Sequence, residues 1–278
     1  MSYSSFEIKS NDDLLLAGQS WMPSNIQAVI CLVHGLGEHI GRFAPMADYM
    51  NNNGTGIMGM DLRGHGKSEG PRGHTPTYNH LLDDISLLVD KAKSDFPNVP
   101  IFLFGHSMGG NIVTNYVLRR NTQGISGAIF SSPWYRLAFE PPAFKVKLGK
   151  MMNGIFPSFT QRNEIDTNAL CSDPAVIRAY EEDPLVHDKI SAGLFFTVYS
   201  AGLWALENAN KLSIPALLTH GDKDALTSCV ASSEFANTAD EKVELKIWDG
   251  LKHEPHNEPE KEKVFGFLCD WVKSKTPE

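Results

Sequence analysis

The sequence of 278 residues predicts an α/β fold in which a mostly parallel sheet is flanked by helices. Short apolar runs of strand length alternate with stretches of helical periodicity. The runs are unbroken, which is typical of strands buried on both faces of a parallel sheet. They cover residues 28–33, 56–60, 101–104, 127–130 and 216–219. Strand–helix alternation with right-handed crossovers predicts a doubly wound arrangement.

The patterns differ toward the edges of the predicted sheet. Residues 3–9 and 14–21 alternate in polarity around Asn11-Asp12-Asp13, which predicts an antiparallel hairpin. Residues 243–248 (VELKIW) also alternate, as expected for a strand nearer an edge. Apolar residues that recur on one face, or a strand-to-helix turn, predict helices at residues 43–50, 81–96, 107–119 and 260–273.

One long stretch, residues 133–190, contains no convincing strand. It includes an amphipathic segment whose apolar residues share a face while lysines lie largely opposite. The apolar residues are Phe144, Leu148, Met151, Met152 and Ile155, and the lysines are Lys145, Lys147 and Lys150. We therefore expect a helical cap at residues 133–190, inserted into a core formed by residues 1–132 and 191–278.

Composition narrows the classes of function. The formal net charge of −8 disfavours nucleic acid and strongly anionic substrates as partners. The four cysteines lack metal-type spacing and are expected to be reduced core thiols, which fits a reducing compartment. The N-terminus lacks the pattern of a secretory signal, and no run of about 18 apolar residues predicts a membrane span. The expected location is cytoplasmic, at most peripheral to a membrane.

The strongest local signal for chemistry is Gly105-His106-Ser107-Met108-Gly109, between a predicted strand and a predicted helix. A bare Gly-x-Ser-x-Gly is only moderate evidence, but this context predicts a strained turn that exposes the serine hydroxyl. Such a turn needs small neighbours, which Gly105 and Gly109 provide. We expect Ser107 to be a nucleophile and the Met108 N–H to stabilise an oxyanion at the helix N-terminus.

A second oxyanion donor is expected after an earlier strand. Residues 28–33 are followed by His34-Gly35-Leu36-Gly37, so the Leu36 N–H is the candidate. The alternative is an ordinary glycine-rich turn without chemistry.

Serine needs a base, and the base needs an orienting acid. In sites of this kind the chain order is serine, acid, histidine. Asp222 and Asp224 both follow the strand at residues 216–219, and we favour Asp224 because it lies further round the loop. His253 and His256 both follow the last strand; we favour His253 as the base and His256 as a pocket-wall residue.

In combination, four motifs make the sequence resemble the monoacylglycerol lipases and their lysophospholipase-like relatives, over about residues 6–275. These motifs are HGLGEH at residues 34–39, Gly41-Arg42, DLRGHGKSEG at residues 61–70 and GHSMGG at residues 105–110. The resemblance is least marked in the insertion.

The resemblance implies an α/β-hydrolase fold with a triad of Ser107, Asp224 and His253, in which Asp224 matches the Gly-x-x-Asp pattern at Gly221. It also implies an oxyanion hole formed by the Leu36 and Met108 N–H groups. Leu36 is bulkier than the small residue common in animal members, so the pocket is expected to differ in shape.

The same resemblance implies which residues surround the leaving alcohol. Glu38, Arg42 and His256 would line the polar end where glycerol sits or leaves, with Tyr180 nearby in the cap. A helix-start carboxylate and a surface cation are the alternative roles of Glu38 and Arg42.

The predicted function is hydrolysis of a single-chain neutral lipid ester, monoacylglycerol to fatty acid and glycerol, through an acyl-enzyme. No cofactor is expected, and no metal, because the chain lacks His-Glu-x-x-His and paired cysteines. The expected partners are a small lipid ester and, transiently through the cap, a membrane surface. Two alternatives stay open: the same triad acting on a lysophospholipid, small ester or peptide N-terminus, and a non-catalytic α/β-hydrolase that only binds.

Overall fold

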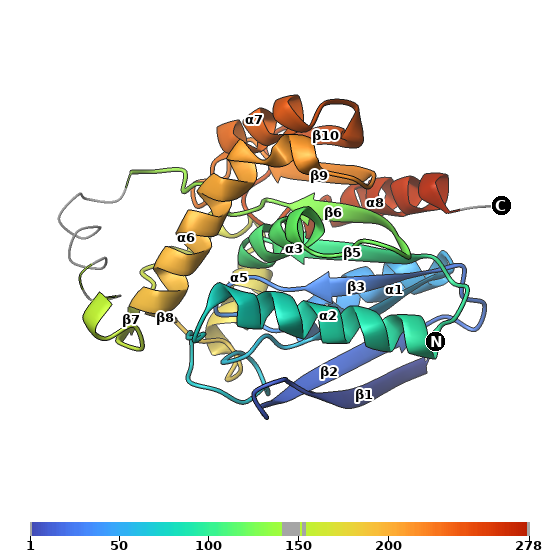
Figure 1. Cartoon of the computed structure of the whole chain (residues 1–278). Coiled ribbons are helices and arrows are strands. Elements are labelled where there is room, and N and C mark those ends of the chain that lie inside the picture. Colours follow the sequence, from blue (N-terminus) through green and yellow to red (C-terminus); the bar gives the residue numbers. More distant parts are fainter. Residues whose placement is uncertain (1, 141–150, 152–153, 277–278) are drawn as a thin grey trace.

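The computed structural model describes residues 2–140, 151 and 154–276 (Figure 1). An eight-stranded sheet runs through its centre in the order β1-β2-β4-β3-β5-β6-β9-β10. Its strands are β1 (Ser2–Lys9), β2 (Leu15–Met22), β3 (Ala28–Val33), β4 (Thr55–Met60), β5 (Ile101–His106), β6 (Ile125–Ser131), β9 (Ala216–Gly221) and β10 (Val243–Trp248).

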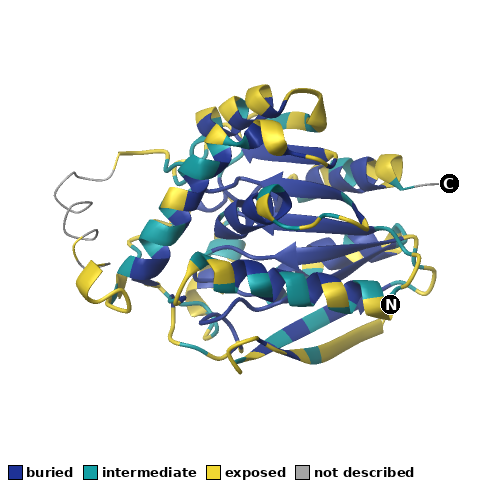
Figure 2. Cartoon of the chain, viewed as in Figure 1, coloured by how far each residue is buried: buried dark blue, intermediate teal, exposed yellow. Residues whose placement is uncertain are grey.

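Neighbouring strands among β4, β3, β5, β6, β9 and β10 pair in parallel, whereas β1 pairs antiparallel with β2 and β2 antiparallel with β4. The prediction of a mostly parallel sheet with an N-terminal hairpin is therefore confirmed. All six residues of β3, β4, β5 and β9 are buried, which explains why their sequences are unbroken apolar runs (Figure 2).

Helices cover both faces of the sheet. Those that do so are α1 (Ala44–Asn52), α2 (Tyr78–Asp95), α3 (Met108–Arg119), α6 (Ala192–Glu207), α7 (Cys229–Ala239) and α8 (Lys261–Lys275), whereas α5 (Pro174–Glu182) lies in the insertion between β6 and α6. Side chains of α2, α3, α6 and α7 pack with Val29 and Cys31 on one face. Side chains of α1 and α8 pack with Ile30 and Leu32 on the other. Successive residues of β3 thus serve opposite faces, as strand geometry requires.

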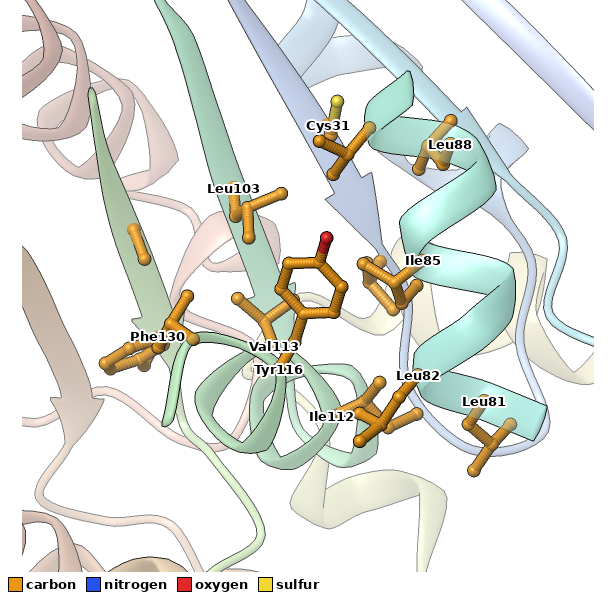
Figure 3. Packing of buried hydrophobic residues seen from close by; sticks show 14 of the residues in the cluster. Cys31, Leu81, Leu82, Ile85, Leu88, Leu103, Ile112, Val113, Tyr116 and Phe130 are labelled. Carbon is orange, nitrogen blue, oxygen red and sulfur yellow. The ribbon is translucent and has the colours of Figure 1, made fainter. Parts of the chain in front are cut away.

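Figure 3 shows the first of these faces from close by. Apolar side chains of α2 and α3 meet those of β3, β5 and β6 in one buried cluster. The labelled members are Cys31, Leu81, Leu82, Ile85, Leu88, Leu103, Ile112, Val113, Tyr116 and Phe130. Because α3 follows β5 directly, this packing fixes the strand-to-helix junction at Ser107.

Between β6 and α6 the chain leaves the sheet. It forms β7 (Thr160–Arg162), the 3₁₀ turn η2 (Thr167–Ala169), α5 and β8 (Lys189–Ser191), with β7 and β8 paired antiparallel. This ribbon was not predicted, since residues 133–190 were expected to hold no strand. Phe144, Leu148 and Met152, with Lys145, Lys147 and Lys150, lie outside the described residues.

Short 3₁₀ turns complete the chain: η1 (Ile40–Phe43), η3 (Ala209–Lys211), η4 (Asp240–Lys242) and η5 (Pro255–Asn257). A search of the described helices finds none long and apolar enough to cross a membrane.

Candidate active site

Ser107 sits on a sharp turn between β5 and α3. Its φ is +56° and its ψ is −117°, a conformation that costs free energy for a residue with a side chain. The neighbouring glycines permit it: a Cβ on Gly105 would lie 2.3 Å from the Gly109 carbonyl oxygen, and one on Gly109 would lie 2.2 Å from the Val33 oxygen. The structure thus places Ser107 on the strained turn that the sequence predicts.

Three side chains from three loops meet in one hydrogen-bonded chain. The Ser107 Oγ lies 2.9 Å from His253 Nε2, and His253 Nδ1 lies 2.7 Å from Asp224 Oδ2. Since a carboxylate only accepts, the Nδ1 atom carries the proton and Nε2 presents a lone pair to the Ser107 hydroxyl. The imidazole is therefore in the tautomer that a general base requires.

The competing candidates lie elsewhere. Asp222 is partly exposed, accepts a hydrogen bond from the Gly250 N–H at 2.7 Å and supports the turn after β10. The His256 ring is buried, stacks on Phe43 with centroids 4.9 Å apart and meets His106 edge-on. Within the described part of the chain, neither ring nitrogen of His256 has a hydrogen-bond partner.

The charges around His253 favour transfer of the Ser107 proton to its imidazole. Burial alone would raise the pKa of Asp224, but the His253 and His220 imidazoles beside it hold that pKa well below its usual range. Burial alone would lower the pKa of His253, but the Asp224 carboxylate outweighs it and raises the pKa above the ordinary value. Asp224 therefore stays ionised and strengthens His253 as a base.

The two residues predicted to donate to the oxyanion lie near Ser107. Leu36 lines the same small cavity as the Ser107 side chain. Met108 is the first residue of α3, and the first N–H groups of a helix have no acceptor within the helix. Gly35 brings this loop close: its N–H donates to Glu38 Oε1 at 2.6 Å, and a Cβ on it would lie 3.2 Å from the Ser107 Cβ.

A cavity of about 30 Å³ adjoins Ser107 and is lined by apolar residues and by a connected group of polar residues, which we call the polar end. Glu38, Arg42 and Tyr180 line it as the resemblance implied, whereas His256 is not among the lining residues and packs behind them through His106. The apolar walls come from Leu36, Leu226 and the inserted residues Ile165 and Leu170.

The polar end is organised by a residue that the sequence analysis missed. Glu254 receives two hydrogen bonds from the Arg42 guanidinium, at 2.9 and 2.8 Å, and Arg42 also donates to Glu38. The Tyr180 ring lies under the guanidinium, 4.7 Å away. The sequence could have indicated Glu254 through its position next to His253. Its pairing with Arg42 could not be seen, because the two residues are 212 positions apart.

The pKa values of the two carboxylates around this guanidinium shift in opposite directions. Burial would raise the pKa of Glu254, but its bidentate pairing with Arg42 holds that pKa well below the usual range. Burial raises the pKa of Glu38, and the charge of Glu254 adds to the effect despite Arg42. The polar end therefore holds a firmly ionised Glu254 and a Glu38 that protonates more readily.

Among the described residues, no group of three or more His, Cys, Asp or Glu side chains is placed to hold a metal ion. Fold and site together define the class of protein: an α/β-hydrolase with a serine in the nucleophile position at the carboxyl end of a central strand.

Comparison with known proteins narrows this class. The profile of the family described as serine aminopeptidase, S33, matches residues 24–260. The monoacylglycerol lipase of Mycolicibacterium smegmatis is 34% identical over 257 residues, covering 91% of each chain. The crystal structure of Paleococcus ferrophilus monoacylglycerol lipase superposes with a TM-score of 0.85 at 30% identity, covering 99% of this chain and 100% of that one.

The chain therefore belongs to the monoacylglycerol lipase-like members of this serine hydrolase family, which confirms the resemblance seen in the sequence. It is also 33% identical over 278 residues to an uncharacterized abhydrolase domain-containing protein of Dictyostelium discoideum. The match covers 99% of this chain but spans only 29% of the length of that protein.

Proposed function

We propose that the protein hydrolyses carboxylic esters of single-chain neutral lipids, with monoacylglycerol as the preferred substrate. The observation that carries the proposal is the hydrogen-bonded chain from Ser107 through His253 to Asp224. The Ser107 oxygen attacks the ester carbonyl carbon while its proton passes to His253 Nε2. The Leu36 and Met108 N–H groups donate hydrogen bonds to the carbonyl oxygen as negative charge develops on it.

The intermediate collapses when His253 returns the proton to the departing alkoxide, so that glycerol leaves and the acyl group remains on Ser107. Water then repeats the sequence: it gives one proton to His253, attacks the acyl carbon and releases the fatty acid as Ser107 regains its hydrogen. Asp224 stays ionised throughout and stabilises the imidazolium of His253.

The polar end of the cavity supports a neutral alcohol. Both terminal nitrogens of Arg42 already bind carboxylates, so a phosphate entering here would face Glu38 and Glu254 without a free guanidinium. Hydroxyl groups can instead donate to carboxylate oxygens. We assign Glu38, Arg42, Glu254 and Tyr180 to the glycerol side of the substrate, with His256 supporting them from behind.

The test combines labelling with a substrate panel. A fluorophosphonate should label Ser107, and the purified chain should cleave monodecanoylglycerol at least about tenfold more efficiently than decanoyl lysophosphatidate, given like-charge repulsion at the polar end. Equal rates on the two would point to a lysophospholipase. Turnover of aminoacyl arylamides alone would point to a peptidase, and absence of labelling to a binding protein.

We further propose that residues 133–190 act as a cap on a core formed by residues 1–132 and 191–278. Support comes from hydrogen bonds that hold the insertion over the site: the Glu254 N–H donates to the Leu170 oxygen, and the His187 N–H to the Gly37 oxygen. Ile165 and Leu170 of the insertion also line the cavity beside Ser107, which supports a role in substrate entry.

We also propose that the protein is cytoplasmic and contacts a membrane surface transiently through the cap. Four described residues near its tip expose large apolar side chains: Met151, Ile155, Phe156 and Phe159. The β7–β8 ribbon beside them contributes to a groove of about 570 Å³ lined by Arg72, Arg162 and Lys189 against the single carboxylate of Asp188. Apolar side chains next to cations suit an anionic lipid surface.

Vesicle sedimentation tests this contact. The protein should bind vesicles of phosphatidylcholine mixed with phosphatidylglycerol more strongly than phosphatidylcholine alone, and Arg162→Glu should reduce the difference. Binding that does not depend on Arg162 or on the anionic lipid would contradict the proposed membrane contact.

A further inference from the structure

The acid of the hydrogen-bonded chain has a second imidazole partner. His220, in β9, is fully buried, and its Nε2 atom lies 2.9 Å from Asp224 Oδ2, the oxygen that also meets His253. Its other ring nitrogen, Nδ1, lies 2.8 Å from the Ser232 hydroxyl on α7. His220 thus bridges the sheet, the acid and a neighbouring helix.

The proton positions follow from the chemistry of the partners. Asp224 is ionised and can only accept, so His220 donates through its Nε2–H group. The Nδ1 lone pair then accepts from the Ser232 hydroxyl, which polarises the ring and strengthens it as a donor. Among the described residues, Ser232 is the only one whose side chain forms a hydrogen bond with His220 Nδ1.

Asp224 is saturated with donors. The Leu226 and Thr227 N–H groups donate to Oδ1 at 2.7 and 2.9 Å. The Thr227 hydroxyl lies 2.8 Å from Oδ2, where it meets the two imidazoles. The backbone donors fix one oxygen in place, so the remaining donors decide how much negative charge Oδ2 offers to His253.

We propose that His220 is a positioning residue for Asp224, which it holds toward His253 and whose negative charge it shares. A carboxylate that donates part of its charge to a second N–H stabilises the imidazolium of His253 less strongly. His220 therefore keeps the base from becoming so basic that it stays protonated at neutral pH. The inference rests on the proposed function only in taking His253 as the base for Ser107.

Two substitutions with side chains of similar length separate this positioning role from a packing role. His220→Gln keeps an N–H near the position of Nε2, whereas His220→Met fills similar space without a donor. The readout is the pH dependence of fluorophosphonate labelling at Ser107, which does not depend on the substrate class. We expect His220→Met to label about tenfold more slowly and to shift the acid limb to higher pH, while His220→Gln stays near the wild type.

Equal profiles for the two variants would overturn the proposal, because packing alone would then explain His220. If His220→Met does not fold, Ser232→Ala replaces it: a weaker Nε2 donor should move the acid limb in the same direction by less. An unchanged profile in Ser232→Ala would also contradict the proposal. A wild-type chain that is not labelled at all would instead refute the proposed function.

Discussion

The region around Ser107 and Asp224 and the exposed part of the proposed cap differ in burial and in hydrogen bonding. Asp224 has a fully buried side chain held by five donors, and beside Ser107 the backbone packs so closely that only glycine fits at positions 105 and 109. Ile155, by contrast, is 74% exposed. Regions with few buried contacts open at low cost in free energy, and saturated ones do not. The chemistry is therefore expected to depend on the saturated region, and we propose that access and substrate choice depend on the exposed one.

The largest effect is expected from removal of the nucleophile. Ser107→Ala should reduce hydrolysis of p-nitrophenyl esters by about a thousand-fold or more and abolish fluorophosphonate labelling, because no acyl-enzyme can form. Mass spectrometry of the labelled protein checks the site. Labelling that persists on another serine would remove Ser107 from this role.

The next effect separates the two aspartates. Asp224→Asn should lower kcat by about a thousand-fold or more, because an amide cannot stabilise the imidazolium and disturbs the tautomer of His253. Asp222→Asn keeps an oxygen that can accept from the Gly250 N–H, in a partly exposed position, and should change kcat by only a few-fold. Comparable losses of kcat in the two variants would refute the assignment of the acid.

A third prediction separates the chemistry from the fold by pH. His253 must be neutral to act as a base, and its pKa is raised, so labelling should be lost as the pH falls through a midpoint above about 6.5. Burial lowers the pKa of His34 and of His256 to about 4, so these rings are neutral when folded but bind protons once unfolded. Stability should therefore fall later, as the pH drops from about 6.5 toward 4.

Labelling rates and thermal unfolding measured across this range check the order of the two losses. Unfolding that precedes the loss of labelling, or an acid limb well below pH 6, would contradict it.

The fold was predictable wherever burial leaves a periodic trace. The range predicted for β3 matches the strand itself, because each of its residues faces one of two apolar layers. Helix α6 was missed because apolar residues surround it and mark no stripe, and α7 because its small and polar residues give little amphipathic contrast. Strands β7 and β8 span three residues each and depend on pairing with one another, which no local pattern reveals.

The site was predictable where geometry follows from position at the end of a strand. Ser107 follows β5 directly and His253 lies in the loop after β10, so motif and topology together place them. Glu254 and His220 were missed because their roles depend on partners such as Arg42 and Ser232 that the folded chain brings together. His256 was expected on the pocket wall, yet it packs against Phe43 behind the wall, a difference of one layer that sequence cannot resolve.

The smallest effect is expected at the cap, and it sharpens the comparison most. If the exposed apolar residues guide an acyl chain from a lipid surface, each buried methylene contributes about 0.8 kcal/mol, so activity should rise from acetyl to about decanoyl esters. Ile155→Asp should then lower kcat/KM on decanoyl esters several-fold. It should leave kcat/KM on acetyl esters unchanged, because the hydrogen bonds that join Ser107, His253 and Asp224 are untouched. Val230→Asp is the matched control, since Val230 is 67% exposed on α7, outside the cap. If both variants lose long-chain activity alike, or Ile155→Asp loses acetyl activity as well, the exposed residues serve only the stability or solubility of the protein.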